Sequence, residues 1–199
     1  EIVFNTSPVG YQEILSDPSY TYQTVVMSYP LIGNYGINSD DFETQTPTIG
    51  GFAVREYNDF PSNWRSEKTL SEVMKEYKIP GIYGIDTRKL VRSIRDYGSR
   101  RCLLTGMETT AEDGVKIISR APILTDAVAM VSRKKITEYP ADGEIKIVAI
   151  DCGMKQNIVR SLNRRGVSVT VVPFDTSSEA IESLKPDGVF ISNGPGDPT

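Results

Sequence analysis

The sequence predicts an α/β protein whose C-terminal part is the start of a doubly wound parallel sheet. Three apolar segments, at residues 145–150, 167–174 and 189–192, alternate with two helical segments at 157–165 and 177–185. Segments this apolar are typical of parallel strands, which are buried on both faces. Their order is βαβαβ, half of a doubly wound sheet. Because such a half-sheet cannot close its own core, we expect this chain to be cut through a domain.

Turn and cap residues support the two helices of this region. Gly166 is expected to end the first helix, and Thr176, together with Glu179, is expected to cap the second. The stretch at 137–144 is polar and rich in turn residues, so it predicts a linker. We therefore expect one domain at residues 1–142, with an incomplete N-terminus, and the truncated parallel sheet at 143–199.

The region before the linker mixes short strands with helices, which predicts a separate α/β domain. Strand candidates lie at 24–29, 51–55, 81–85 and 102–105, and the chain begins inside another, Glu-Ile-Val-Phe at 1–4. Thr69-Leu-Ser-Glu72 is a capping box that begins a helix with a one-sided apolar stripe.

A second helix is expected between Asp86 or Thr87 and Gly98. It should bury four apolar residues, Leu90, Val91, Ile94 and Tyr97, and expose four basic ones, Arg88, Lys89, Arg92 and Arg95. The basic set favours a solvated face over a docking surface for a partner.

The composition is that of an ordinary globular protein, and it argues against several classes of partner. Hydrophobic residues make up 39% of the 199 residues and charged residues 24%, with a formal net charge of −4. Basic residues form only short clusters, so no nucleic acid partner is expected. No apolar run approaches the roughly 18 residues that cross a bilayer, so no membrane partner is expected. Two cysteines make no disulfide scaffold, which favours a cytoplasmic location.

The sequence contains no histidine. Neither a Ser-His nor a Cys-His pair can therefore form within these residues, and a metal site with a histidine ligand is excluded. There is also no Walker loop, no Rossmann glycine pattern and no carboxylate cluster with metal-ligand spacing. We expect no nucleotide cofactor and no metal in this chain.

The loop that follows the last strand candidate, Asn-Gly-Pro-Gly-Asp-Pro at 193–198, is the strongest site candidate. Ligands of open α/β sheets bind outside the carboxyl ends of the strands. Gly194, Gly196 and Asp197 offer backbone N–H groups there, whereas Pro195 and Pro198 donate none and stiffen the chain. Such donors suit a carboxylate, a phosphate or the oxyanion of an acyl-transfer intermediate. A plain connection would also use glycine and proline, but two of each in six residues favours a site.

Local patterns favour structural roles for the other candidates. Cys152 follows the first parallel strand, but it has no histidine to activate it and lacks the glycine-flanked elbow of nucleophiles. It is predicted to be a small, semi-buried residue, and Cys102 is predicted to be part of the core. Asp17-Pro-Ser-Tyr20 predicts an Asx turn, in which Ser19 would be a turn residue.

Seven segments between residues 4 and 198 form a set that points to one family. They are Phe-Asn-Thr-Ser (4–7), Gly-Tyr-Gln-Glu-Ile-Leu (10–15), Asp-Pro-Ser-Tyr (17–20), Tyr-Pro-Leu-Ile-Gly-Asn-Tyr-Gly (29–36), Asp-Thr-Arg-Lys-Leu (86–90), Asp-Cys-Gly-Met-Lys-Gln-Asn (151–157) and Ser-Asn-Gly-Pro-Gly-Asp-Pro (192–198). The set resembles the small, glutamine-hydrolysing subunit of carbamoyl phosphate synthetase. The last segment alone would indicate only a class I glutamine amidotransferase, and the second and fourth narrow the resemblance to this subunit.

The resemblance implies a small-subunit N-terminal domain followed by an amidotransferase domain with a flavodoxin-like sheet. Members of the family hydrolyse L-glutamine through a Cys-His-Glu triad and a thioester, and pass the ammonia through a tunnel to a large subunit. That partner makes carbamoyl phosphate from bicarbonate and ATP, for arginine and pyrimidine biosynthesis. The resemblance thus implies a cytoplasmic heterodimer with no cofactor in this subunit, and with ATP and Mg and K ions in the large subunit.

The resemblance also assigns roles to residues one by one. Gly194 and Gly196 match loop glycines whose backbone contacts glutamine, and Gly194 would contribute to the oxyanion hole. Ser19 matches a serine that reaches the bound glutamine, a role that its local pattern does not predict. Cys152 matches a non-catalytic position. In the family pattern the nucleophile and its histidine and glutamate lie beyond Thr199, so we expect no catalytic residue and no glutaminase activity within this chain alone.

Two other functions are compatible with the sequence. One is a flavodoxin-like module that uses the terminal loop to hold an anion or a flavin phosphate, although no Ser/Thr-rich phosphate loop is present. The other is a catalytically dead amidotransferase homologue that acts as an interaction subunit. Residues after Thr199 would distinguish the second alternative from an enzyme.

Overall fold

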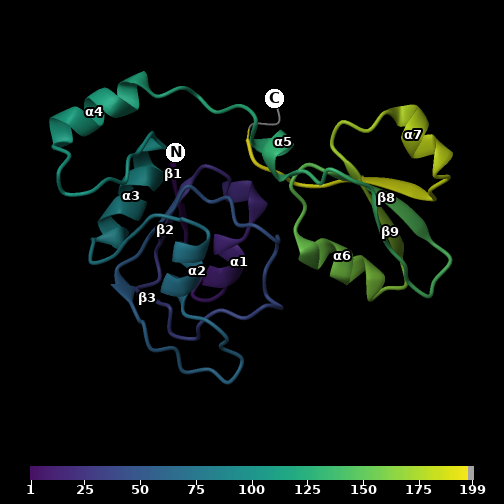
Figure 1. Cartoon of the computed structure of the whole chain (residues 1–199), viewed down its shortest axis with the longest axis horizontal. Coiled ribbons are helices and arrows are strands. Elements are labelled where there is room, and N and C mark those ends of the chain that lie inside the picture. The colour runs from purple at the N-terminus through teal and green to yellow at the C-terminus, as the bar shows by residue number, and fades with distance from the viewer. Residues whose placement is uncertain (197–199) are drawn as a thin grey trace. The chain divides into compact units, whose positions relative to one another are not determined.

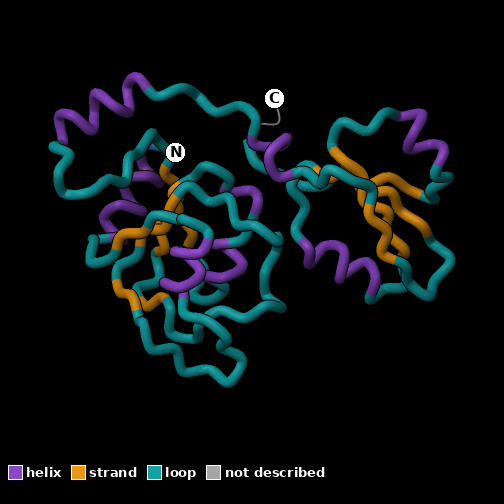
Figure 2. The backbone as a smooth tube through the Cα atoms, viewed as in Figure 1, coloured by secondary structure: helices purple, strands orange, loops and turns teal. Residues whose placement is uncertain are grey.

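The chain forms two compact units in a computed structural model that describes residues 1–196. The first unit holds Glu1–Ser16 and Tyr22–Leu124, and the second holds Asp17–Thr21 and the chain from Thr125 onward. Figure 1 labels the helices and strands, and Figure 2 shows the mixture of the two along the backbone. The predicted α/β class is confirmed.

The first unit is built on a parallel sheet with strand order β1-β2-β4-β6. Its strands are β1 (Ile2–Asn5), β2 (Thr24–Met27), β4 (Gly51–Ala53) and β6 (Gly81–Ile82), and a separate parallel pair joins β3 (Leu31–Ile32) to β5 (Glu56–Tyr57). The predicted strand at 102–105 is wrong, because that stretch pairs with no strand among residues 1–196 and the isolated bridge to β1 is made by Arg100.

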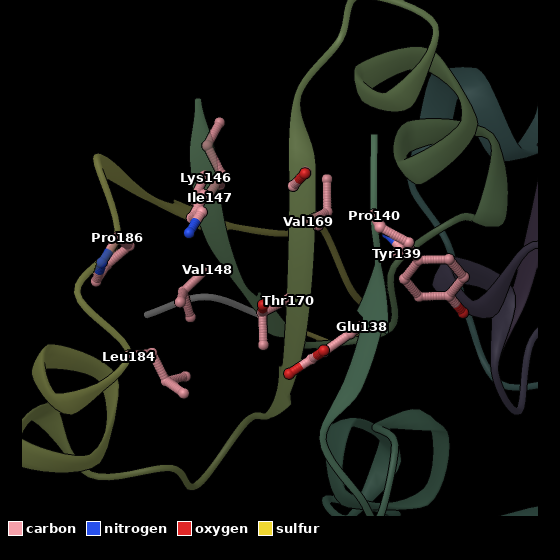
Figure 3. Close-up of a pocket in the computed structure, with 11 residues that line it drawn as sticks. Glu138, Tyr139, Pro140, Lys146, Ile147, Val148, Val169, Thr170, Leu184 and Pro186 are labelled. Carbon is pink, nitrogen blue, oxygen red and sulfur yellow. The ribbon is translucent and has the colours of Figure 1, made fainter. Parts of the chain in front are cut away.

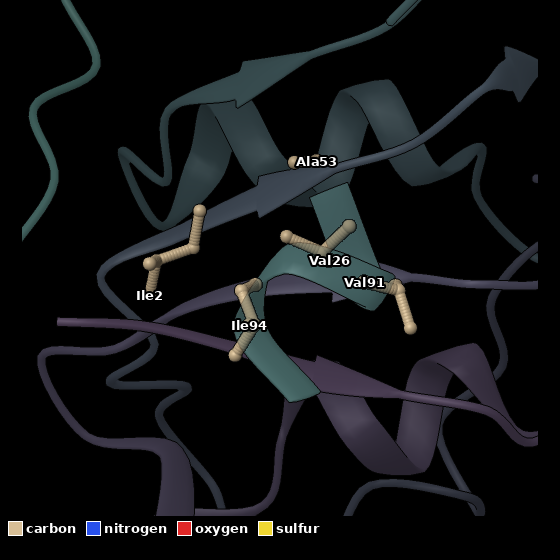
Figure 4. Close-up of a cluster of buried hydrophobic side chains, with 5 residues drawn as sticks. All are labelled: Ile2, Val26, Ala53, Val91 and Ile94. Atoms are coloured by element: carbon tan, nitrogen blue, oxygen red, sulfur yellow. The ribbon is translucent and has the colours of Figure 1, made fainter. Parts of the chain in front are cut away.

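Four helices belong to this unit: α1 (Tyr11–Leu15), α2 (Leu70–Glu76), α3 (Thr87–Tyr97) and α4 (Ala111–Arg120). Figure 4 shows how α3 packs on the sheet, with Val91 and Ile94 against Ile2, Val26 and Ala53 of three neighbouring strands. The capping box of α2 is confirmed, since the side chains of Thr69 and Glu72 each accept a hydrogen bond from the other residue's backbone N–H.

The ends of α3 follow the prediction, whereas one of its expected core residues does not. Asp86 caps the helix by accepting a hydrogen bond from the Lys89 N–H, and Gly98 ends it at φ 82°, a conformation that glycine adopts without strain. Tyr97 was expected in the core but is 82% exposed. Thr87, Val91 and Ile94 form the buried face of α3, and the next position on that face is residue 98. Tyr97 lies one residue before that position, so its side chain points away from the sheet.

The second unit contains a four-stranded sheet with order β10-β8-β9-β7. β8 (Lys146–Asp151), β9 (Ser168–Pro173) and β10 (Gly188–Ile191) are parallel, and α6 (Gln156–Asn163) and α7 (Ser178–Ser183) connect them. The predicted βαβαβ order is confirmed. Thr176 was expected to cap α7, but Ser177 is the cap, and the Thr176 hydroxyl donates to the Pro173 carbonyl instead.

Part of the predicted linker is a strand. Residues Thr137–Tyr139 form β7, which pairs antiparallel with β9 after the short helix α5 (Ala127–Val131). Tertiary pairing overrides the polar local sequence here. β7 precedes residue 142 and lies in the sheet of the second unit. The domain division at residue 142 stays a prediction.

The two central strands are buried on both faces, as predicted, but β10 is not. The α6 face buries Ala149, Met154, Val159, Val169 and Val171, and the α7 face buries Val148, Val172 and Ile181. On β10, Val189 and Ile191 are 54% and 68% exposed. Within residues 1–196, β10 is an edge strand, and α7 contacts β8 and β9 instead.

Among the helices of residues 1–196, none combines the length and the apolar character that crossing a bilayer requires.

Candidate functional site

Two backbone turns meet at the carboxyl ends of β8 and β10. These strands are parallel neighbours, so the turn at 151–154 and the loop that begins at Asn193 leave the same edge of the sheet. A Cβ atom on Gly194 would lie 1.9 Å from the Cys152 carbonyl oxygen, far inside van der Waals contact. Gly153 has φ 117°, and a Cβ atom there would lie 2.9 Å from Cδ of Pro195. The two turns therefore pack backbone against backbone, which only glycine permits.

A buried carboxylate holds the first of these turns. Asp151 is 3% exposed, and its Oδ1 accepts hydrogen bonds from the N–H groups of Gly153 (2.9 Å) and Met154 (2.8 Å). Its Oδ2 accepts from the Arg133 N–H (3.1 Å) and lies 3.4 Å from the Arg133 Nε. All the polar contacts of this carboxylate are thus charge-assisted or made to backbone, so the turn has little freedom.

The guanidinium of Arg133 extends this network to two further elements. Its Nη2 donates to the Gln156 side chain at the start of α6 (3.1 Å), and its Nη1 donates to the Tyr139 hydroxyl. It also lies 5.1 Å from the centre of the Tyr139 ring, within cation–π range. Arg133 therefore fixes β7 and α6 to the turn that supports Gly194.

A segment from far earlier in the chain completes the site. The 3₁₀ turn η1 (Pro18–Tyr20) begins at Asp17, whose Oδ1 accepts from the Ser19 N–H (2.9 Å), so the predicted Asx turn is confirmed. Asp17 Oδ2 is also 2.6 Å from Lys155 Nζ. The Ser19 hydroxyl accepts a hydrogen bond from Asn193 Nδ2 (2.9 Å), although the two residues are 174 positions apart.

The structure thus brings Ser19 to the same loop as Gly194. Gly196 lies further along this loop, exposed and with φ 91°. The other predicted members of the loop, Asp197 and Pro198, lie outside the described residues. Sequence reasoning missed Asn193 and Lys155 as contacts of the 17–20 segment, and the only local signal was the Asx turn itself.

Cys152 lies beside this site, and its environment disfavours the reactive thiolate. Burial raises the pKa of its thiol, and the negative charge of Asp151 raises it further. A raised pKa favours the neutral thiol near neutral pH, whereas a nucleophile needs the thiolate. Its environment agrees with the structural role that the sequence predicts.

We expect the substitution Lys155→Met to loosen the 17–21 segment. The Asp17 carboxylate is 8% exposed and would lose its cation, although the partial exposure of Lys155 limits the effect. Hydrogen exchange at the amides of Ser19, Tyr20 and Thr21 should accelerate about fivefold, corresponding to roughly 1 kcal/mol. Arg164→Met, at an exposed residue of the same unit, is the matched control and should leave these amides unchanged. Equal exchange in both variants would contradict a clamping role for Lys155.

A pocket of about 300 Å³ lies elsewhere in this unit. Figure 3 shows residues of β7, β8 and β9 around it, among them Glu138, Lys146 and Thr170, with Leu184 and Pro186 from the chain after α7. It lies near the first residues of β8 and β9, whereas ligands of open α/β sheets bind at the carboxyl ends. None of Ser19, Gly194 and Gly196 lines it. Within residues 1–196 there is also no group of three or more side chains suited to hold a metal ion.

Comparisons with known proteins match both parts of the chain. Residues 1–104 match the family model of the carbamoyl-phosphate synthase small chain, CPSase domain, and residues 148–199 match that of glutamine amidotransferase class-I. Similar relatives include the carbamoyl phosphate synthase small chain of Staphylococcus epidermidis, 52% identical over 199 residues that cover 100% of this chain and 54% of the relative. That of Archaeoglobus fulgidus is 48% identical over 200 residues, 100% of this chain and 56% of the relative. The pyrimidine-specific small chain of Halalkalibacterium halodurans is 50% identical over 198 residues, 100% of this chain and 54% of the relative. The chain spans about half the length of the curated relatives it matches.

Proposed function

Because this chain belongs to the carbamoyl-phosphate synthase small-chain family, we propose that it forms part of a subunit that hydrolyses glutamine and delivers ammonia to a synthetase partner. The observation that carries the proposal is the hydrogen bond between Ser19 and Asn193, next to the tightly packed Gly194. This hydrogen bond joins two segments that are far apart in sequence and that a glutamine site of this family needs. In this proposal Ser19, Gly194 and Gly196 bind glutamine.

The chemistry of the loop suits amide hydrolysis. When a nucleophile attacks the side-chain amide of glutamine, negative charge develops on the carbonyl oxygen, and a fixed N–H group such as that of Gly194 stabilises it. Removing one such donor typically lowers kcat by roughly 10²–10³-fold. The nucleophile forms an acyl intermediate and releases ammonia, and water then releases glutamate. The family pattern places the nucleophile and its base after Thr199, and these 199 residues contain no histidine to act as the base.

The partner is the synthetase large subunit, which uses the ammonia, bicarbonate and ATP to make carbamoyl phosphate in the cytoplasm for arginine and pyrimidine biosynthesis. No cofactor is assigned to this chain, and ATP and Mg and K ions belong to the partner. The Halalkalibacterium halodurans relative is named as a pyrimidine-specific small chain. The names of the other two relatives mention no pathway.

The test compares two nitrogen sources. A small chain that contains this sequence and continues beyond Thr199 is combined with the large subunit, and carbamoyl phosphate formation is measured with glutamine or with ammonia. We expect glutamine to support synthesis only when the small chain is present, and ammonia to support it with or without the small chain. Glutamine-dependent synthesis that does not require the small chain would refute the proposal. A longer small chain that binds its partner but releases no ammonia would instead support the interaction-subunit alternative.

We expect the 199-residue chain by itself to release no ammonia from glutamine. A donor loop stabilises an oxyanion but cannot form the acyl intermediate without a nucleophile. Ammonia release is measured against a blank without protein, with the longer small chain as the positive control. Turnover above the blank would show that residues 1–199 contain a nucleophile that we have not assigned.

A further inference from the structure

The side chain of Ser192, the residue immediately after β10, bridges the two turns of the candidate site. It is 8% exposed. Its hydroxyl oxygen accepts a hydrogen bond from the Cys152 N–H (3.0 Å), and the hydroxyl donates to the Asn193 carbonyl oxygen (2.7 Å). The Cys152 N–H can only donate and the Asn193 carbonyl can only accept, so the direction of both hydrogen bonds is fixed by chemistry.

The Asn193 carbonyl and the Gly194 N–H are two ends of one peptide group. Because a trans peptide is planar, its C=O and N–H bonds point in opposite directions and turn together. A hydrogen bond that fixes the Asn193 carbonyl therefore also fixes the direction of the Gly194 N–H. Within residues 1–196, no group accepts a hydrogen bond from that N–H, so it is not held by a bond of its own.

We propose that Ser192 is a positioning residue that aims the Gly194 N–H at the oxyanion formed during glutamine hydrolysis. The inference rests on the proposed function, since it assigns Ser192 a part in the same site. Glycine at position 194 makes such a device necessary, because a residue without Cβ allows the preceding peptide to rotate more freely than any other.

The neighbouring contacts hold the ends of this peptide but leave its rotation to Ser192. Gly194 packs against the Cys152 carbonyl, which limits translation of the loop, and the Asn193 side chain is bound to Ser19. Of the hydrogen bonds within residues 1–196, the one from Ser192 is the bond made to the carbonyl of this peptide. Its loss leaves the peptide in place but free to turn.

A purely structural role for Ser192 would be to satisfy the buried Cys152 N–H. The two roles differ in what the substitution Ser192→Ala changes. Loss of a structural hydrogen bond lowers stability, with no particular effect on the transition state of the reaction. If Ser192→Ala lets the Gly194 N–H turn away from the oxyanion, kcat falls and KM for glutamine stays nearly unchanged. The reason is that the oxyanion exists only in the transition state and in the intermediates that resemble it.

The matched control is Ser168, at the start of β9 in the same unit. Its hydroxyl also bridges two backbone groups, accepting from the Ala141 N–H (3.0 Å) and donating to the Ala141 carbonyl (3.3 Å). Ser168→Ala therefore removes the same kind of hydroxyl without touching the loop. Ser192→Thr keeps a hydroxyl at the site and serves as the conservative rescue.

The experiment uses the longer small chain in complex with its large subunit. For Ser192→Ala we expect kcat for glutamine hydrolysis to fall by about 10- to 100-fold, less than for the loss of an oxyanion donor, with KM within about twofold. Ser168→Ala should keep the wild-type kcat, Ser192→Thr should recover most of it, and ammonia-dependent synthesis should be unchanged throughout. An unchanged kcat in Ser192→Ala, or an equal loss in Ser168→Ala, would overturn the proposal.

A second readout needs no activity. Residual dipolar couplings of protein containing isotope-labelled glycine report the orientation of each glycine N–H bond. We expect the coupling of Gly194 to change in Ser192→Ala and to stay constant in Ser168→Ala. An unchanged Gly194 coupling in Ser192→Ala would refute the positioning role even if the wild-type protein hydrolyses glutamine. If the wild-type protein hydrolyses no glutamine but the Gly194 coupling still changes in Ser192→Ala, the proposed function alone is refuted.

Discussion

Gly194→Ala is expected to reduce glutamine-dependent synthesis strongly in a small chain that continues beyond Thr199. The new Cβ would lie 1.9 Å from the Cys152 carbonyl oxygen and 2.8 Å from its carbon, so the loop must move. Those atoms belong to the backbone of a turn that Asp151 holds, and they cannot rotate away as a flexible side chain would. Displacing the proposed oxyanion donor should lower kcat/KM for glutamine by at least roughly 100-fold, while ammonia-dependent synthesis remains.

Two other glycines of the second unit separate this clash from a general effect of alanine. Gly188, at the start of β10, has an ordinary φ, and a Cβ atom there would meet nothing within 4 Å, so Gly188→Ala should be neutral. At Gly196 a Cβ atom would also meet nothing within 4 Å among residues 1–196, but φ is +91°, so alanine there costs about 1–2 kcal/mol of backbone strain. We expect an intermediate loss for Gly196→Ala. If Gly194→Ala retained activity within a few-fold of wild type, the tight packing of the two turns would not matter for the reaction.

The second large effect is expected for Asp151→Asn, on stability. The asparagine oxygen can still accept from Gly153 and Met154, but its NH₂ group would then face the N–H and guanidinium donors of Arg133. The Arg133 side chain is 23% exposed and would lose its carboxylate partner. Breaking a buried pair in this way typically costs 3–5 kcal/mol, so we expect a loss of about 3 kcal/mol in the second unit.

Hydrogen exchange is the suitable measurement, because the single tryptophan of the chain, Trp64, lies in the first unit and its fluorescence does not report on the second. Amides of the central strands β8 and β9 should exchange roughly 100-fold faster in Asp151→Asn, as expected for about 3 kcal/mol. Asp96→Asn breaks an exposed pair with Arg95 and should have almost no effect. Wild-type exchange rates in Asp151→Asn would mean that the carboxylate is replaceable.

Local sequence predicted the elements that have a strong pattern of their own. The central βαβαβ order followed from apolar runs and helix caps, and α2 and α3 followed from their capping residues. β7 escaped prediction because Thr137–Tyr139 is short and mixed, and becomes a strand only by pairing with β9. The stretch at 102–105 has the composition of a strand, but without a partner strand it remains irregular.

The site divides in the same way. The glycine and proline content of the loop after β10 predicted a site of backbone N–H donors, and the Asp17-Pro-Ser-Tyr20 pattern predicted an Asx turn. No local pattern could join Ser19 to Asn193, because the contact depends on the folded path of the 173 residues between them. The link from Arg133 to Asp151 was hidden for a similar reason, since an arginine after a short helix has no sequence signature of burial.

The membership of Asp17–Thr21 in the second unit has a consequence for how the protein can be divided. The chain leaves the first unit after Ser16, contributes five residues to the second, and returns at Tyr22. A protein that starts at residue 125 therefore lacks Asp17 and Ser19, the partners of Lys155 and Asn193. A protein that ends at residue 124 keeps Asp17 but lacks Lys155. No single cut, by protease or by gene design, releases both units intact.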